Sequence, residues 1–184
     1  MPAMESIAKQ AERITLVKAV PEHAELLCRI FSGVNAQKYN PITEISVEEL
    51  ARSLEQSGSA FSERALFYRL FGAVDDVLFG TFIIKNIAWR KKTGEIGFSL
   101  LDEWQGRGLG SALVYKCVLN IFRQTELDSI WATVSQANEA SKKIMQRLGF
   151  ADCGFYKEKF LIKAKPVAQV VYKLNRQQAR ELFL

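Results

Sequence analysis

Hydrophobic and polar residues along this chain follow two periods, and each period predicts one type of element. Alternation of period two, with many β-branched and aromatic residues, predicts strands at residues 14–18, 66–74, 77–87, 95–101, 129–134, 154–162 and 167–174. Apolar residues at helical spacing predict helices at residues 22–31, 47–56, 109–125 and 138–148. The order β-α-α-β-β-β-α-β-α-β-β predicts an α/β (α+β) fold, a mixed sheet with helices on both faces.

Local signals support the ends of several elements. Ser46, with Glu49 three residues later, predicts a capping box ahead of the second helix. Asp75 and Asp76 form a short polar pair between two hydrophobic runs, which predicts a hairpin turn. Gly149 stands where the end of the last helix needs a left-handed residue.

Composition indicates one globular domain. With 184 residues, 48% of them hydrophobic, the chain can bury a core without disulfides or metal. Residues 1–12 are polar and are expected to form a flexible leader, with a single domain at residues 13–184. The three cysteines are odd in number and lack a CxxC spacing, so neither a disulfide framework nor a zinc site is indicated. No apolar run fits a signal peptide or a membrane span, and we expect a cytoplasmic protein with no membrane partner.

The charge balance suits an anionic ligand. Lys and Arg number 25 against 20 Asp and Glu, a net charge of +5. A nucleic-acid-binding protein is one alternative that this charge allows, but no run of five basic residues exists, so no nucleic-acid partner is expected.

The strongest chemical signal is the glycine turn, Gln105-Gly106-Arg107-Gly108-Leu109-Gly110, between a predicted strand and a predicted helix. Such a turn directs backbone N–H groups and the helix N-terminus at one point, where a pyrophosphate can bind. A P-loop is excluded because no Lys followed by Ser or Thr comes after the glycines. The dinucleotide fingerprint fits only partly, since Ser111 replaces its third glycine.

Three ordered motifs resemble the GNAT acetyltransferases. The spacing Gln105, Gly108, Gly110 is similar to their acyl-CoA signature. The segment 94–98 before it, and Asn138-x-x-Ser141 leading to Leu148-Gly149-Phe150 after it, resemble the branch that acetylates the N-termini of ribosomal proteins. The resemblance covers residues 14–176. It implies the GNAT fold with a mostly antiparallel sheet of about seven strands, and acetyl-CoA as cosubstrate. We expect no metal, and either a monomer or a homodimer, since the last strand pair can complete one chain or join a partner.

The resemblance also implies site residues. Cofactor-binding positions lie on the strand before the turn, in the turn and at the start of the following helices: Phe98, Ser99, Leu100, Leu101, Gln105, Gly106, Arg107, Gly108, Leu109, Gly110, Ser111, Asn138, Ser141 and Lys142. Glu95 matches the strand position at which some members carry the general base; Glu158 and Glu44 are reserve candidates. Many members place a tyrosine where this chain has Met145, so the resemblance moves the proton donor for the CoA thiolate to Ser141.

Each role has a structural alternative. Glu95 can be a strand charge paired with Arg90 or Lys92, and Asn138 can be a helix N-cap. The leading hypothesis is transfer of the acetyl group directly to a primary amine, either a protein N-terminus of the ribosomal-protein kind or a small amine. Because such amines are mostly protonated at neutral pH, attack requires a base. The other hypothesis is a degenerate acyl-CoA-binding regulatory module without turnover.

Overall fold

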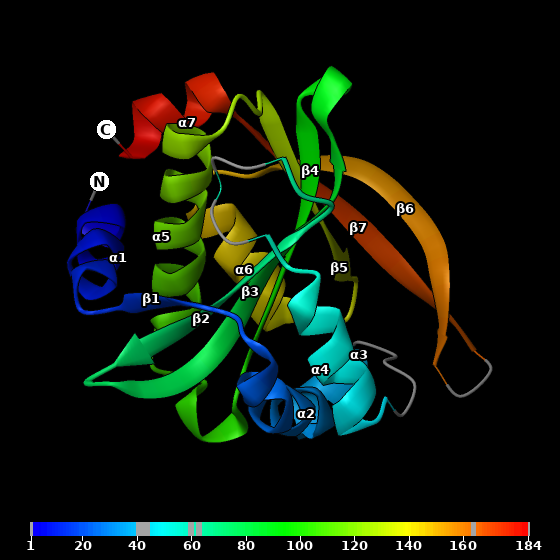
Figure 1. Cartoon of the computed structure of the whole chain (residues 1–184). Helices are drawn as coiled ribbons and strands as arrows, with labels where there is room; N and C mark the ends of the chain where they lie inside the picture. The colour runs from blue at the N-terminus through cyan, green and yellow to red at the C-terminus, as the bar shows by residue number, and fades with distance from the viewer. Residues whose placement is uncertain (1, 40–44, 59–60, 62–63, 163–164, 184) are drawn as a thin grey trace.

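One seven-stranded sheet organises the chain (Figure 1). The computed structural model describes residues 2–39, 45–58, 61, 64–162 and 165–183, and of residues 2–3, 155–162 and 165–167 it describes the backbone alone. The strand order is β1-β2-β3-β4-β5-β7-β6, and every neighbouring pair is antiparallel except β4 with β5. The strands are β1 (Thr15–Lys18), β2 (Tyr68–Val74), β3 (Val77–Ala88), β4 (Thr93–Leu100), β5 (Ser129–Ser135), β6 (Ala151–Ile162) and β7 (Lys165–Asn175). The predicted mixed, mostly antiparallel sheet is confirmed.

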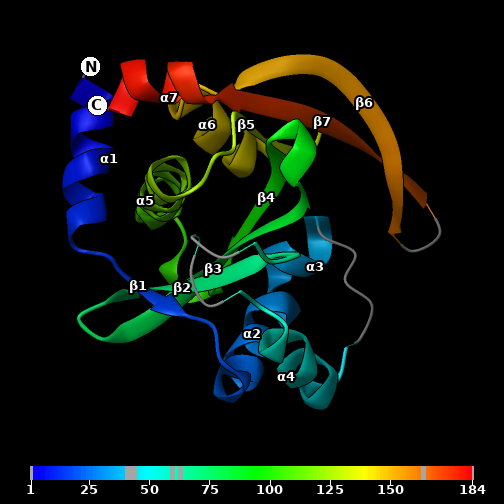
Figure 2. The ribbon, with the colours of Figure 1, turned by 45° about the horizontal axis from the view of Figure 1, so that its top comes forward.

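Helices cover both faces of the sheet (Figure 2). They are α1 (Pro2–Glu12), α2 (Ala24–Ser32), α3 (Val34–Tyr39), α4 (Val47–Glu55), α5 (Leu109–Gln124), α6 (Glu139–Arg147) and α7 (Arg176–Phe183), with short 3-10 turns η1 (Pro21–His23), η2 (Trp89–Lys91) and η3 (Asp102–Trp104). On one face, α1, α5, α6 and α7 share a core with the strands. On the other face, α2 and α4 share a second core that includes Phe71 of β2.

The central helix α5 is buried along most of its length. Ala112, Leu113, Cys117 and Ile121 are fully enclosed, as the four-residue apolar spacing predicts. Burying this stripe fixes the helix against the sheet, and the start of the helix carries the glycine turn.

The prediction of a flexible leader at residues 1–12 needs correction. Residues 2–12 form helix α1, which lies beside α5 in both views (Figures 1 and 2). Ile7 and Ala11 are one helical turn apart and are only 8% and 3% exposed. Lys116 of α5 donates hydrogen bonds to the carbonyls of Ala11 at 3.0 Å and Ile14 at 2.5 Å. Packing against α5 therefore stabilises a segment whose sequence has only a sparse apolar stripe.

Two further helices, α3 and α7, were not predicted, whereas the local signals were read correctly. The Ser46 hydroxyl accepts from the Glu49 N–H at 3.1 Å, and the Glu49 carboxylate accepts from the Ser46 N–H at 2.9 Å. Asp75 and Asp76 have φ of 50° and 62°, the left-handed pair that a two-residue hairpin needs. Gly149 has φ of 73°.

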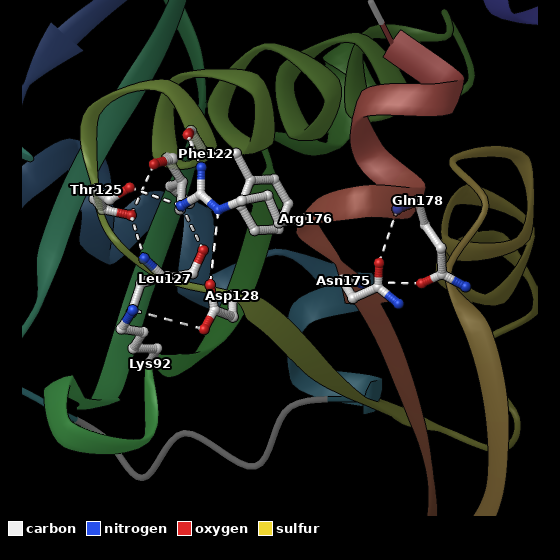
Figure 3. Close-up of polar contacts among 9 residues, drawn as sticks. Lys92, Phe122, Thr125, Leu127, Asp128, Asn175, Arg176 and Gln178 are labelled. Carbon is white, nitrogen blue, oxygen red and sulfur yellow. Dashed lines mark hydrogen bonds and ion pairs between the residues drawn. The ribbon is translucent and has the colours of Figure 1, made fainter.

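Arg176 anchors the far end of α5 (Figure 3). Its guanidinium donates to the carbonyls of Phe122, Thr125 at 2.7 Å and Leu127 at 2.5 Å. These carbonyls belong to the last turn of α5 and the loop after it, where no helical N–H can satisfy them. Arg176 begins α7 directly after β7, so one side chain fixes the end of α5 to the sheet.

Candidate active site

Strands β4 and β5 diverge after a short paired segment, and we call the region between residues 96–100 of β4 and residues 132–135 of β5 the fork. Their parallel pairing ends at Glu95 and Trp131, although β4 continues to Leu100 and β5 to Ser135. Beyond that point each strand is still paired on its outer side, β4 with β3 and β5 with β7. The backbone groups of β4 that face β5 beyond Glu95 have no ladder partner there, so they can bond the amides of a ligand arm. Three predicted cofactor-binding residues, Phe98, Ser99 and Leu100, lie on this arm of the fork.

The glycine turn lies between the end of this arm and α5. Gly106 and Gly108 have φ of 73° and 78°, a left-handed backbone that glycine adopts without strain. Gly108 is the N-cap of α5, so the first free N–H groups of the helix follow it. A Cβ on Gly106 would meet nothing within 4 Å, which leaves open space against the backbone of the turn. The structure thus joins the turn and the first turn of α5, from Gly106 to Ser111, in an anion-binding arrangement that fits a pyrophosphate.

Side chains from two distant segments support the turn. Gln105 donates from Nε2 to the Leu100 carbonyl at 3.2 Å, and its Oε1 accepts from Asn35 Nδ2 at 2.5 Å. On another side of the turn, Gln10 of α1 donates from Nε2 to the Arg107 carbonyl at 2.7 Å. The Gln105 side chain therefore holds the turn to the start of α3.

The start of α6 brings together the other predicted positions. Asn138 is the N-cap, since its Oδ1 accepts from the Ser141 N–H at 3.1 Å. Lys142 donates from Nζ to the Gln136 carbonyl at 3.1 Å and to Glu139 at 2.6 Å. Met145 is completely buried, so it fills the core and has no access to a thiolate. Ser141 is half-buried in the first turn of α6, which begins soon after β5 ends.

Glu95 lies at the point where the two arms separate. Its side chain is 4% exposed, and it accepts hydrogen bonds from Asn86 Nδ2 at 2.6 Å and Thr133 Oγ1 at 3.0 Å. The alternative pairing with Lys92 is not observed, because Lys92 lies 3.9 Å from Asp128. The two hydrogen bonds, one from β3 and one from β5, orient the Glu95 carboxylate on β4, and its remaining lone pairs can still take a proton.

Asn86 and Thr133 were missed by the sequence analysis. Asn86 has φ of 50° and lies in the irregular stretch of β3 between Lys85 and Ala88. An asparagine inside a run of β-branched residues is a signal for such a left-handed position, although it does not indicate the partner. Of the reserve carboxylates, Glu44 lies outside the described residues, and so does the side chain of Glu158.

Other chemistries find no support in the part of the chain that the structure describes. There, no three His, Cys, Asp or Glu side chains gather into a possible metal site. No helix in that part combines the length and the apolar character needed to cross a membrane. Burial raises the pKa of the Cys117 thiol well above its usual range, so this cysteine is not a nucleophile.

Comparison with known proteins decides which family uses this arrangement. The family model described as "Acetyltransferase (GNAT) domain" matches residues 13–151, which is most of the chain and contains the fork, the glycine turn and α6. The chain belongs to the GNAT acetyltransferase family. The resemblance drawn from the motifs and the predicted enzyme class, an acetyl-CoA-dependent N-acetyltransferase, are confirmed at the level of this family. Acetyl-CoA is the cosubstrate of GNAT enzymes, and the fork and glycine turn offer the backbone groups that its arm and pyrophosphate require.

Individual GNAT proteins resemble the whole chain. A relative from Bacillus licheniformis, named uncharacterized N-acetyltransferase p20, is 26% identical over 169 residues, covering 91% of this chain and 95% of its own. The spermidine N-acetyltransferase of Vibrio cholerae, solved with CoA and spermine, has a TM-score of 0.82 at 16% identity and covers 92% of this chain and 99% of its own. The ribosomal-protein-S5-alanine acetyltransferase of Vibrio fischeri has a TM-score of 0.79 at 20% identity, with coverages of 89% and 93%. At these identities the two structures show a shared fold, while their acceptors differ.

Proposed function

We propose that this GNAT chain transfers the acetyl group of acetyl-CoA directly to a primary amine, either a protein N-terminus or a small amine. The observation that supports this most is the position of Glu95 at the opening of the fork. The glycine turn lies past the end of the β4 arm, so a CoA molecule bound at the turn can extend its pantetheine arm along the fork toward Glu95.

The proposed reaction moves protons at the amine nitrogen and at the CoA sulfur. The protonated amine loses a proton to Glu95, directly or through a water molecule, and its lone pair attacks the thioester carbonyl carbon. The C–N bond forms and the C–S bond breaks, so the electron pair of that bond leaves on sulfur. The nitrogen is positively charged after the attack, and it gives its second proton to solvent as the amide forms. Ser141 gives its hydroxyl proton to the CoA thiolate and regains one from solvent. Backbone groups of β4 orient the acetyl carbonyl, and no cysteine takes part.

The acceptor is an amine in both kinds of solved neighbour. One is named for spermidine and the other for an alanine of ribosomal protein S5. A protein N-terminal amine titrates near pH 8 and an alkylamine near about 10.4, so the former loses its proton more easily at neutral pH.

A second candidate function is an acyl-CoA-binding module without turnover. It is favoured by one observation, that both Glu95 oxygens already have a hydrogen-bond donor. In that case Glu95 acts only to hold the fork open at its origin.

A turnover screen separates the two functions. Thiol release from acetyl-CoA is measured with peptides that carry ribosomal-protein N-termini, polyamines, amino acids and aminoglycosides, while CoA affinity is measured by calorimetry. Acetylated product with at least one amine supports the enzyme. Tight CoA binding without product on any amine would contradict the transferase and leave the binding module.

A further inference from the structure

Arg69 of β2 lies on the sheet face that carries Glu95. Side chains alternate along a strand, and Phe71 of β2 belongs to the core under α2 and α4, so Arg69 two residues earlier faces the same side. Ile96 of β4 is buried in the core on the α5 side, which places Glu95 on the face shared by Arg69. Arg69 is paired with Ile83 of β3.

The groups around Arg69 contact its guanidinium but do not neutralise its positive charge. One N–H donates to Thr81 Oγ1 at 3.2 Å, and the guanidinium carbon lies 5.6 Å from the ring centroid of Phe31 on α2. No carboxylate among the described residues lies within 4 Å of it. Desolvation lowers the pKa of Arg69 to about 10, so the charge persists at neutral pH at a cost to stability. A half-buried cation that keeps most of its five donors unpaired is suited to a ligand oxygen.

A second unpaired donor lies across the fork. Gln169 of β7 is 3% exposed, and its Nε2 has no hydrogen-bond partner among the described residues. Its neighbour Val170 is in the core on the α5 side, so Gln169 faces the same side as Arg69 and Glu95. A buried amide N–H without a partner is rare in folded proteins, so an oxygen of a water molecule or of a ligand is expected beside it.

The Arg69 guanidinium and the Gln169 Nε2 group are both hydrogen-bond donors, so each needs an acceptor oxygen as its partner. A polyamine in its charged form offers N–H donors alone, whereas an amino acid or a peptide offers a carbonyl or carboxylate oxygen beside its amine. We propose that Arg69 is a specificity-determining residue that binds this oxygen of the acceptor, and that the site therefore selects amines with a neighbouring carbonyl or carboxylate group. The proposal rests on the proposed acetyl transfer.

The test compares acceptors with and without the oxygen. Steady-state KM and kcat are measured for an alanine-initiated peptide, alanine, alaninamide and spermidine, with the wild-type chain, Arg69→Met and Arg69→Lys. Arg52→Met is the matched control, because Arg52 is an exposed arginine of α4. CoA affinity without acceptor and the thermal midpoint show that each variant is folded.

We expect Arg69→Met to raise KM at least about tenfold for the peptide, alanine and alaninamide, because a site built to bond an oxygen loses that bond. CoA affinity and spermidine turnover should stay within twofold of wild type, and the midpoint should not fall, since a desolvated charge is removed. Arg69→Lys should recover alanine, which carries a full carboxylate, better than the peptide, because lysine keeps the charge but not the planar fork. A smaller effect on alanine than on the peptide and alaninamide with Arg69→Met identifies a peptide carbonyl as the group bound.

Three results would overturn the assignment. Equal loss for all four acceptors in a folded variant would show a structural role for Arg69, and an unchanged KM would show no role. Wild-type preference for spermidine over every oxygen-bearing acceptor would refute the selectivity while leaving acetyl transfer in place. Turnover of no acceptor by the wild-type chain would instead remove the proposed function itself.

Discussion

Replacing Gly108 with alanine tests how the glycine turn is held. Gly108 has φ of 78°, and an added Cβ would lie 2.7 Å from Oε1 of Gln10 on α1. An L-residue in the left-handed region costs about 1–2 kcal/mol. The same Cβ displaces Gln10, whose hydrogen bond to the Arg107 carbonyl contributes about 0.5–1.5 kcal/mol. We therefore expect Gly108→Ala to lower the free energy of unfolding by about 1.5–3.5 kcal/mol, the sum of these two effects.

Two further variants separate the strain from the lost contact. Gln10→Ala removes only the hydrogen bond, so the double variant should be no less stable than Gly108→Ala, a coupling of about 0.5–1.5 kcal/mol. Gly154→Ala is the matched control for strain, since Gly154 has φ of 61° and its Cβ would meet nothing within 4 Å.

Urea unfolding of the four variants gives the free energies, and calorimetry gives their CoA affinities. Gly108→Ala and Gln10→Ala should weaken CoA binding, whereas Gly154→Ala should leave it unchanged. Each 1.4 kcal/mol of distortion in the turn weakens CoA about tenfold. Strictly additive effects of the Gln10 and Gly108 substitutions, or an unaltered CoA affinity in Gly108→Ala, would refute the account of α1 as a support for the turn.

Three other predictions follow from the site and its scaffold. Glu95→Gln should lower kcat at pH 7 and recover part of it at higher pH, where the free amine is more abundant. An unaltered pH–rate profile in Glu95→Gln would exclude Glu95 as the base. Arg176→Met should lower the free energy of unfolding, measured in urea, by about 2–4 kcal/mol, because the carbonyls at the end of α5 lose a charged donor. A loss well under about 1 kcal/mol would contradict this capping role of Arg176. Iodoacetamide should modify the exposed Cys153 long before the buried Cys117. Peptide mass spectrometry follows the two modification rates. Equal rates for the two cysteines would contradict the burial that raises the pKa of Cys117.

The sequence predicted those parts of the fold that depend on neighbours along the chain. The apolar stripe of α5, the Ser46 capping box and the Asp75-Asp76 hairpin all involve residues within a few positions of each other. Helix α1 could not be predicted in this way, because its stability comes from packing against α5 about a hundred residues later.

The same distinction applies to the candidate site. The glycine spacing and the start of α6 are local, so the turn and the Asn138 cap were both anticipated. The environment of Glu95 is not local, since Asn86 and Thr133 reach it from two other strands. Strand pairing alone brings these three side chains together, and the pairing cannot be derived from one-dimensional periodicity.

The bonds around Gln105 have a consequence for how the two substrates meet. Gln105 joins the glycine turn to Asn35, and Asp102 of η3 accepts from the Val34 N–H at 2.8 Å, so the start of α3 is bonded both to the glycine turn and to η3. If CoA shifts the turn, these bonds pass the shift to α3, which contacts α2. The affinity for each substrate should then depend on the presence of the other by the same factor, as thermodynamic linkage requires. Bound CoA would in this way change the affinity of the chain for its amine acceptor before acetyl transfer begins.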